Sequence, residues 1–140
     1  MQENYDYDEC IIACGASSIV PPLPGVSLPG VFTMRTPQDA IELREYLEHT
    51  GAKRAVVAGG GFIGLEVAEN LMQKGLAVTV IDMADQIMPG FDKDMADYAR
   101  RHLESKGIKV RLNTRLEAVL GESKAEVSAC RMARLRRTLS

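Results

Sequence analysis

Apolar and polar residues follow two alternating periods over the middle of the chain. Residues 54–58 and 77–82 are short, apolar runs rich in β-branched side chains, which is typical of strands buried on both faces of a sheet. Residues 62–74, which separate them, place apolar side chains at the three- and four-residue spacing of a helix. Gly75 follows directly and is able to end that helix. The pattern predicts two parallel strands joined by a helix.

A second helix and a third strand continue this pattern. Asp92 is a suitable cap for a helix that runs to about Ser105, Gly107 is able to stop it, and residues 108–112 predict a strand. The order strand, helix, strand, helix, strand makes one mononucleotide-binding half of a doubly wound sheet, with right-handed crossovers. The predicted fold class is therefore α/β, an incomplete Rossmann-like parallel sheet.

Another helix is predicted upstream of this unit. Thr36 is suited to its N-cap, Pro37 to its first position, and Asp39 to a place near the positive end of its dipole. Apolar residues then recur at helical spacing until Gly51, which predicts the end of the helix.

A proline-rich loop over residues 20–30 precedes this helix, and a short strand is predicted before the loop, over residues 7–13. Each proline fixes its own φ, removes a hydrogen-bond donor and biases the preceding residue toward extended geometry. The loop is therefore a stiff connector, and we predict a domain boundary near residue 25.

Composition places the chain among ordinary soluble proteins. It has 140 residues, of which 46% are hydrophobic and 26% charged, enough for one core. No apolar run approaches the ~20 residues of a membrane helix, and the acidic N-terminus lacks the features of a secretory signal. The cysteines, Cys10, Cys14 and Cys130, form neither an even framework nor a paired metal motif. We therefore expect a cytoplasmic protein without a membrane partner.

The end of the chain is basic, although the whole chain carries a formal net charge of −2. Residues 124–140 contain five basic residues and one acid, and they show weak helical propensity and no clear strand alternation. A basic tail can bind nucleic acid, but this one has neither aromatic residues nor a motif. We expect residues 123–140 to be an irregular basic tail, with no nucleic-acid partner.

The clearest chemical motif lies where the first predicted strand of the central unit meets its helix. Gly59-Gly60-Gly61-Phe62-Ile63-Gly64 fits the pattern GxGxxG. The first glycine permits a tight turn, the second lets the main chain approach a pyrophosphate, and the third lets the helix pack closely on the strand. A pyrophosphate then binds the unpaired N–H groups at the positive end of the helix. The motif alone is weak evidence, but here it directly follows a strand and opens a helix.

Asp82 completes this motif at the end of the next strand, eighteen residues beyond Gly64. An acid at this place is suited to bind the hydroxyls of the adenosine ribose, and it would repel a 2′-phosphate. No arginine lies within the next four residues to bind such a phosphate. The sequence therefore favours NADH over NADPH.

Glu66 has two interpretations. It lies two residues beyond Gly64, where its carboxylate could reach the nicotinamide end of a cofactor, or it is an ordinary surface residue; spacing alone does not decide. His49 and His102 lie on predicted helices without a Cys or His partner at ligand spacing, so we predict surface roles for both.

These residues resemble a known family. Residues 56–68, Val-Val-Ala-Gly-Gly-Gly-Phe-Ile-Gly-Leu-Glu-Val-Ala, resemble the NAD(P)H-binding segment of the pyridine nucleotide-disulfide oxidoreductases. Residues 7–25 resemble the exit from the flavin domain of that family, and residues 28–40 its linker into the NAD domain. Ile87-Met-Pro and residues 92–95 are similar to the NADH oxidase and coenzyme A-disulfide reductase branch.

The resemblance implies roles for individual residues. It places Ile63 and Glu66 beside the nicotinamide and Asp82 on the adenosine ribose, and it suggests that the ring of Phe91 stacks on adenine. It places Ala13 and Gly15 against FAD, although Cys14 replaces a threonine of the family pattern. It matches Gly59, Gly61 and Gly64 to the pyrophosphate glycines, and we expect Gly60 and Phe62 of the same turn to be cofactor-binding residues as well.

The resemblance also implies a domain organisation. Residues 1–25 correspond to a remnant of the flavin domain and its linker, residues 26–122 to the NAD(H)-binding Rossmann domain, and residues 123–140 to the tail. The first glycine motif, the redox-active cysteine, the second flavin segment and the dimerisation domain have no counterpart in the sequence. We therefore expect a fragment that does not complete catalysis alone.

The implied whole protein is a homodimer that uses NADH and FAD and passes hydride from NADH to FAD. Electrons would go on to a disulfide, a peroxide or oxygen. A dinucleotide-binding module without catalysis remains the alternative, because a Rossmann half binds nucleotides without doing chemistry. A dehydrogenase without flavin fits less well, since the upstream strand and proline loop resemble a flavin-domain exit.

Overall fold

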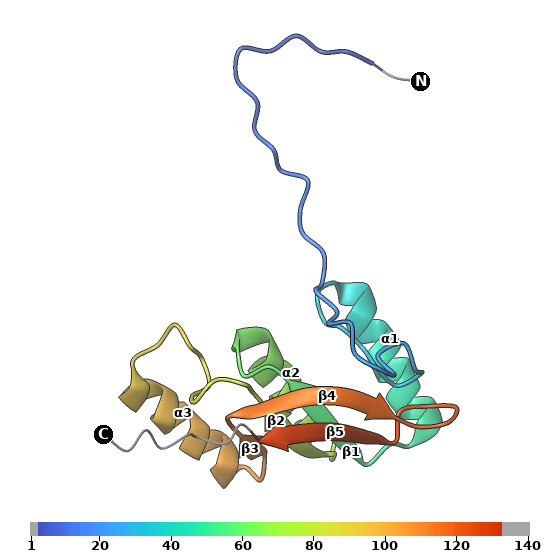
Figure 1. Cartoon of the computed structure of the whole chain (residues 1–140), viewed down its shortest axis with the longest axis vertical. Helices are drawn as coiled ribbons and strands as arrows, with labels where there is room; N and C mark the ends of the chain where they lie inside the picture. The colour runs from blue at the N-terminus through green and yellow to red at the C-terminus, as the bar shows by residue number, and fades with distance from the viewer. Residues whose placement is uncertain (1–2, 133–140) are drawn as a thin grey trace.

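A three-stranded parallel sheet forms the centre of the molecule. The computed structural model describes residues 3–132, with side-chain surroundings up to residue 126. Strands β1 (Arg54–Ala58), β2 (Ala77–Ile81) and β3 (Lys109–Arg111) lie in the order β1-β2-β3 (Figure 1). The parallel pairing of β1 with β2 and of β2 with β3 confirms the predicted fold.

Two helices connect these strands and cover the sheet. Helix α2 (Phe62–Gln73) contacts β1 and β2, and helix α3 (Lys93–Ser105) contacts β3. Both end before glycines with positive φ, at Gly75 and Gly107, as the sequence predicted. The buried side chains come from both helices, the central strand and the loops: Ala68, Leu71, Leu76, Val78, Val80, Ile87, Ala96, Leu103 and Ile108.

Strand β1 differs from the prediction in its burial. The expected strand is buried on both faces, whereas Val56 is 49% exposed and the strand alternates between exposed and half-buried residues. Strand β1 is the edge of the sheet, and Ala55 and Val57 pack against the core on its other face. In the part of the chain that the structure describes, one face of β1 is therefore open.

Helix α1 (Pro37–Thr50) begins at the cap that the sequence predicted. The hydroxyl of Thr36 accepts from the N–H of Asp39, and a carboxylate oxygen of Asp39 accepts from the N–H groups of Thr36 (2.6 Å) and Arg35 (2.8 Å). These backbone donors hold the pKa of the Asp39 carboxyl below its ordinary value. Gly51 ends the helix in the left-handed conformation.

Because of this cap, the stability of the fold depends on the protonation of Asp39 and therefore on pH. Because the folded pKa of Asp39 is lowered, its contribution to stability is complete above the ordinary value of 3.8 and is lost as the pH falls through the folded pKa. We expect Asp39→Asn to lower the melting temperature near neutral pH. At acid pH, the melting temperatures of the variant and the parent should lie closer together. Melting curves from pH 6 to pH 2, with Glu45→Gln on the same helix as control, measure this. An equal effect of Asp39→Asn at every pH would contradict it.

We expected an irregular tail from residue 123, but the end of the described chain forms a strand. Strands β4 (Thr114–Leu120) and β5 (Val127–Met132) form an antiparallel hairpin, shown in orange and red in Figure 1. The prediction was wrong because backbone pairing with β4 orders a segment that has no strand periodicity of its own. Residues 133–140 of the predicted tail lie outside the described residues.

The hairpin also holds the proline-rich connector. The N–H of Val119 donates to the carbonyl of Pro24 (2.9 Å), and the N–H of Ala125 donates to that of Pro29 (2.8 Å). A Cβ on Gly25 would lie 1.9 Å from the Val119 carbonyl oxygen, so only glycine fits beneath this strand. The connector therefore packs against the β4–β5 hairpin of the domain.

The N-terminal segment forms no strand, in contrast to the prediction for residues 7–13. Residues 3–20 extend away from the domain (Figure 1), and Ile11 and Ile12 are 90% and 85% exposed. A strand requires a partner for its backbone groups, and the described residues offer this segment none. Cys10 and Cys14 are exposed and make no disulfide. None of the described helices has the length and apolar character needed to cross a membrane.

Candidate nucleotide-binding site

The glycine turn joins β1 to α2 at the carboxyl edge of the sheet. Gly59 has a φ of +119°, which favours glycine, and its N–H donates to the carbonyl of Ile81. A Cβ on Gly64 would lie 2.1 Å from the carbonyl oxygen of Gly59. The first and last glycines of the motif therefore allow a sharp turn and a close approach of the helix to it, as the sequence predicted.

Gly61 lies at the mouth of this turn as the N-cap of α2, with φ −79° and ψ 178°. A Cβ built there meets no atom within 4 Å, although these angles suit any residue. No side chain caps the helix, and the first N–H groups of a helix have no partner within it. The turn therefore presents free N–H groups and the positive end of the helix dipole to an open space.

Asp82 follows β2 and lies beside the turn. One carboxylate oxygen accepts from the N–H of Gly60 (2.6 Å) and the other from the N–H of Ala84 (2.8 Å). Its own N–H donates to the carbonyl of Arg111 (3.0 Å), and its carbonyl accepts from the N–H of Thr114 (2.7 Å). The acid is therefore fixed by its main chain and its side chain, and each carboxylate oxygen keeps a lone pair for a further donor.

Gly60 is buried and connects the turn to the acid. A Cβ on it would lie 2.9 Å from Cγ2 of Ile87 and 3.1 Å from Oδ2 of Asp82. Its carbonyl accepts from the N–H of Met88 (2.8 Å). The sequence analysis did not assign Ile87 or Met88 to the site. The Ile-Met-Pro motif, which resembles the family, was the available signal, but a sequence does not show the backbone contact that Met88 makes with Gly60.

Two exposed rings lie together above the turn. Phe62 and Phe91 pack edge to face, with ring centroids 5.5 Å apart, and are 64% and 42% exposed. The loop between β2 and α3 therefore folds back onto the start of α2. The structure brings Phe91 to the candidate site, and its contact with adenine stays a prediction.

Ile63 and Glu66 face a different side of the turn. Both line a cleft of about 740 Å³ between α1 and α2, and Phe62 is a further lining residue. Leu43 and Leu47 of α1 form the opposite wall. A ligand that crosses the turn from Asp82 toward this cleft would pass over the free N–H groups of α2.

Ala13 and Gly15 are not brought to this site. Both are exposed on the N-terminal segment, and the neighbour of Gly15 is the side chain of Arg35. The candidate site residues therefore fall into one cluster at the glycine turn and a separate pair on the extended segment.

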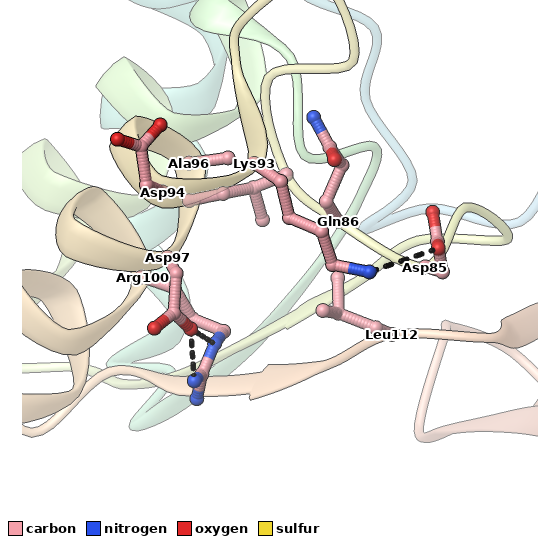
Figure 2. Close-up of a pocket in the computed structure, with 9 residues that line it drawn as sticks. Asp85, Gln86, Lys93, Asp94, Ala96, Asp97, Arg100 and Leu112 are labelled. Carbon is pink, nitrogen blue, oxygen red and sulfur yellow. Dashed lines mark hydrogen bonds and ion pairs between the residues drawn. The ribbon is translucent and has the colours of Figure 1, made fainter.

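A second cavity of about 540 Å³ lies between the β2–α3 loop and α3 (Figure 2). Charged partners meet around it: Lys93 lies 3.8 Å from Asp85, and Arg100 donates to Asp97. The hydrogen bond from Arg100 holds the pKa of the Asp97 carboxyl below its usual range. The Arg100–Asp97 pair lies within α3, and the Lys93–Asp85 pair between the loop and the helix is exposed, so neither pair indicates a binding or catalytic role.

The described residues contain no group of His, Cys, Asp and Glu side chains able to hold a metal ion. The imidazole of His49 lies 2.7 Å from the carbonyl of Glu45 in its own helix, and His102 is exposed. The arrangement places free N–H groups beside a carboxylate, a set of donors and acceptors that suits an anionic ligand with hydroxyl groups.

Comparison with known proteins agrees with this geometry. The family model for the pyridine nucleotide-disulphide oxidoreductases matches residues 1–134. The chain is 44% identical over 124 residues to a curated NADH oxidase of Methanocaldococcus jannaschii, which covers 88% of the chain and 27% of that protein. Its fold matches the reduced CoADR-RHD crystal structure of Bacillus anthracis with a TM-score of 0.76 and 34% identity, covering 83% of this chain and 21% of that one.

Two further solved structures differ in their nucleotide. The water-forming NADH oxidase of Lactobacillus brevis, bound to NADH, matches with a TM-score of 0.71 and 31% identity, over 78% of this chain and 24% of that one. A variant engineered as an NADPH oxidase and bound to NADPH matches with a TM-score of 0.67 and 26% identity over the same shares. It carries five substitutions: glycine to alanine, aspartate to alanine, alanine to arginine, methionine to serine and proline to arginine.

The match is broad over this chain and partial over its relatives. The chain spans about a quarter of the length of the curated relatives, 27% for the NADH oxidase described above. The family model nevertheless extends over nearly all of the chain and includes the glycine turn and Asp82. The chain belongs to the pyridine nucleotide-disulphide oxidoreductase family.

Proposed function

We propose that this chain is the NADH-binding part of a flavin-dependent oxidoreductase that takes hydride from NADH. Its share of the reaction is to bind the dinucleotide and to direct the nicotinamide toward a flavin domain. The electron acceptor of the whole protein would be a disulfide, a peroxide or oxygen. The names of the relatives, among them NADH oxidases and sulfur reductases, support this range.

One observation carries the proposal: the carboxylate of Asp82 lies against the N–H of Gly60 while Gly61 leaves the mouth of the turn open. A diphosphate in this opening would accept hydrogen bonds from the free N–H groups of α2. The ribose next to it would then lie within reach of the free lone pairs of Asp82. The site fits a dinucleotide at both its phosphates and its sugar.

The charge of Asp82 supports NADH rather than NADPH, because a 2′-phosphate would meet a carboxylate in its place. The engineered NADPH oxidase supports the same assignment. Its substituted glycine and aspartate stand eighteen residues apart and its proline seven residues further on, which is the spacing of Gly64, Asp82 and Pro89 here. The substituted pair that follows the aspartate corresponds to Met83 and Ala84.

The nicotinamide end would lie in the cleft between α1 and α2, where Ile63 and Glu66 form part of the wall. When bound, FAD supplies the hydride acceptor of such a reaction. The exposed apolar side chains of Ile11 and Ile12 support docking of the N-terminal segment to a further domain, with Ala13 and Gly15 at its flavin.

Calorimetric titration of this chain with NADH and NADPH in parallel tests the proposal. We expect NADH to bind more tightly by about 10-fold or more, because a phosphate beside Asp82 costs at least one charge-assisted hydrogen bond. Equal affinity for both nucleotides would contradict the role of Asp82. Binding of neither would contradict the proposed function itself.

A further inference from the structure

Met88 adopts a backbone conformation that its side chain does not favour. Its φ is +50°, in the left-handed region, where only one other non-glycine residue of the described chain, Asn113, is found. Asparagine adopts this conformation several-fold more readily than most residues, whereas methionine has no such preference. Residues held in such conformations are kept there by their surroundings and gather at binding sites.

The surroundings that hold Met88 belong to the glycine turn. Its N–H donates to the carbonyl of Gly60 (2.8 Å), and its carbonyl accepts from the N–H of Phe91 (2.9 Å). The side-chain amide of Gln86 donates to the carbonyl of Phe91 (2.9 Å) and closes the loop on itself. Ile87, the preceding residue, is fully buried in the core and lies against Gly60.

The Gly60 residue is thus held at both of its polar atoms. Its N–H donates to Asp82, and its carbonyl accepts from Met88. No Cβ fits on it, because Ile87 occupies that space. A change in the backbone of Met88 would therefore move Gly60, and with it the donor that fixes the Asp82 carboxylate.

We propose that Met88 is a positioning residue for nucleotide discrimination: its left-handed backbone orients the Gly60 peptide and thereby the carboxylate of Asp82. The proposal rests on the proposed function, since it concerns the same NADH site. It assigns the effect to the backbone of Met88 and not to its thioether side chain.

Two substitutions at this position separate backbone from side chain. Met88→Val keeps an apolar side chain, but β-branched residues strongly disfavour a φ of +50°. Met88→Gly removes the side chain and retains both the N–H and the preferred conformation. If the backbone decides, Met88→Val weakens binding and Met88→Gly does not; if side-chain packing decides, Met88→Gly is the weaker binder. Met95→Val, on the exposed side of α3 (53% exposed), is the matched control.

The measurements are calorimetric affinities for NADH and NADPH and the hydrogen-exchange rate of the Gly60 amide, followed by NMR in the full chain. We expect Met88→Val to weaken NADH binding about 3- to 10-fold, the effect of one lost hydrogen bond, to bring the two nucleotides closer in affinity, and to speed exchange at Gly60. Met88→Gly should keep both affinities of the parent, although it removes a side chain that packs against the core, and Met95→Val should match the parent in all three measurements.

Two results would overturn the proposal while the parent chain still binds NADH. One is an unchanged ratio of NADH to NADPH affinity in folded Met88→Val. The other is weakened NADH binding in Met88→Gly, which decides the matter even if Met88→Val does not fold. A parent chain that binds neither nucleotide would instead contradict the proposed function.

Discussion

The variant that combines Gly64→Ala, Asp82→Ala, Met83→Arg, Ala84→Ser and Pro89→Arg should bind NADPH more tightly than NADH. It removes the carboxylate that would repel a 2′-phosphate and adds two guanidinium groups, one just after β2 and one in the β2–α3 loop. Charge-assisted hydrogen bonds contribute about 1.5–3 kcal/mol each. The ratio of NADPH to NADH affinity should therefore rise by about 100-fold or more relative to the parent chain.

Gly64→Ala has a separate effect within this set. Its methyl group would lie 2.1 Å from the carbonyl oxygen of Gly59, so the turn must open to accept it. The same change without Gly64→Ala is therefore the informative companion, because it avoids the clash with Gly59, although Asp82→Ala still removes the acceptor of the Gly60 N–H. Asp85→Ala, which removes the neighbouring exposed acid, serves as the control and should keep the preference for NADH. A five-position variant that still prefers NADH would contradict the role of Asp82 in favouring NADH over NADPH.

Gly61→Ala should abolish most NADH binding without unfolding the protein. The new methyl group meets no protein atom within 4 Å, and the backbone angles of Gly61 allow alanine, so the free energy of unfolding should change by less than about 1 kcal/mol. The same methyl group stands at the mouth of the turn, where the diphosphate must approach the N–H groups. Each lost hydrogen bond to a charged phosphate costs about 10-fold or more, so a 100-fold loss of affinity is expected.

Gly90→Ala provides the matched control, because it also adds a methyl group in open space at a glycine without positive φ. Denaturant unfolding and calorimetry on both variants and the parent check the prediction. Unchanged NADH binding by folded Gly61→Ala would mean that the diphosphate lies elsewhere. A large loss of stability in Gly61→Ala would mean that this glycine serves the fold rather than the ligand.

Local signals sufficed for much of the fold. The strands β1 and β2, the helix between them and the cap at Thr36 follow from apolar spacing and from residue types with one preferred place. The glycine turn was predictable for the same reason, since the positive φ of Gly59 and the close approach at Gly64 require glycine, and both positions belong to one short motif.

The prediction failed where an element depends on whether a partner strand is present. Residues 127–132 have no strand pattern and form β5 because β4 pairs with them, whereas residues 7–13 have a strand pattern and form none because they lack a partner. The sequence of β1 predicts a strand buried on both faces, yet one face of β1 is exposed. Pairing and burial are properties of the surroundings, which a local pattern does not contain.

The sequence by itself determined the strand–turn–helix unit, the alternation of strands and helices along the chain and the presence of an acid one strand beyond the glycines. Only the tertiary structure decided that Asp82 holds Gly60, that Met88 closes the turn from the other side, and that Ile63 and Glu66 face a cleft made with α1. The reason is physical: spacing along the chain sets local conformation, whereas contacts between different elements depend on how the core packs beneath them.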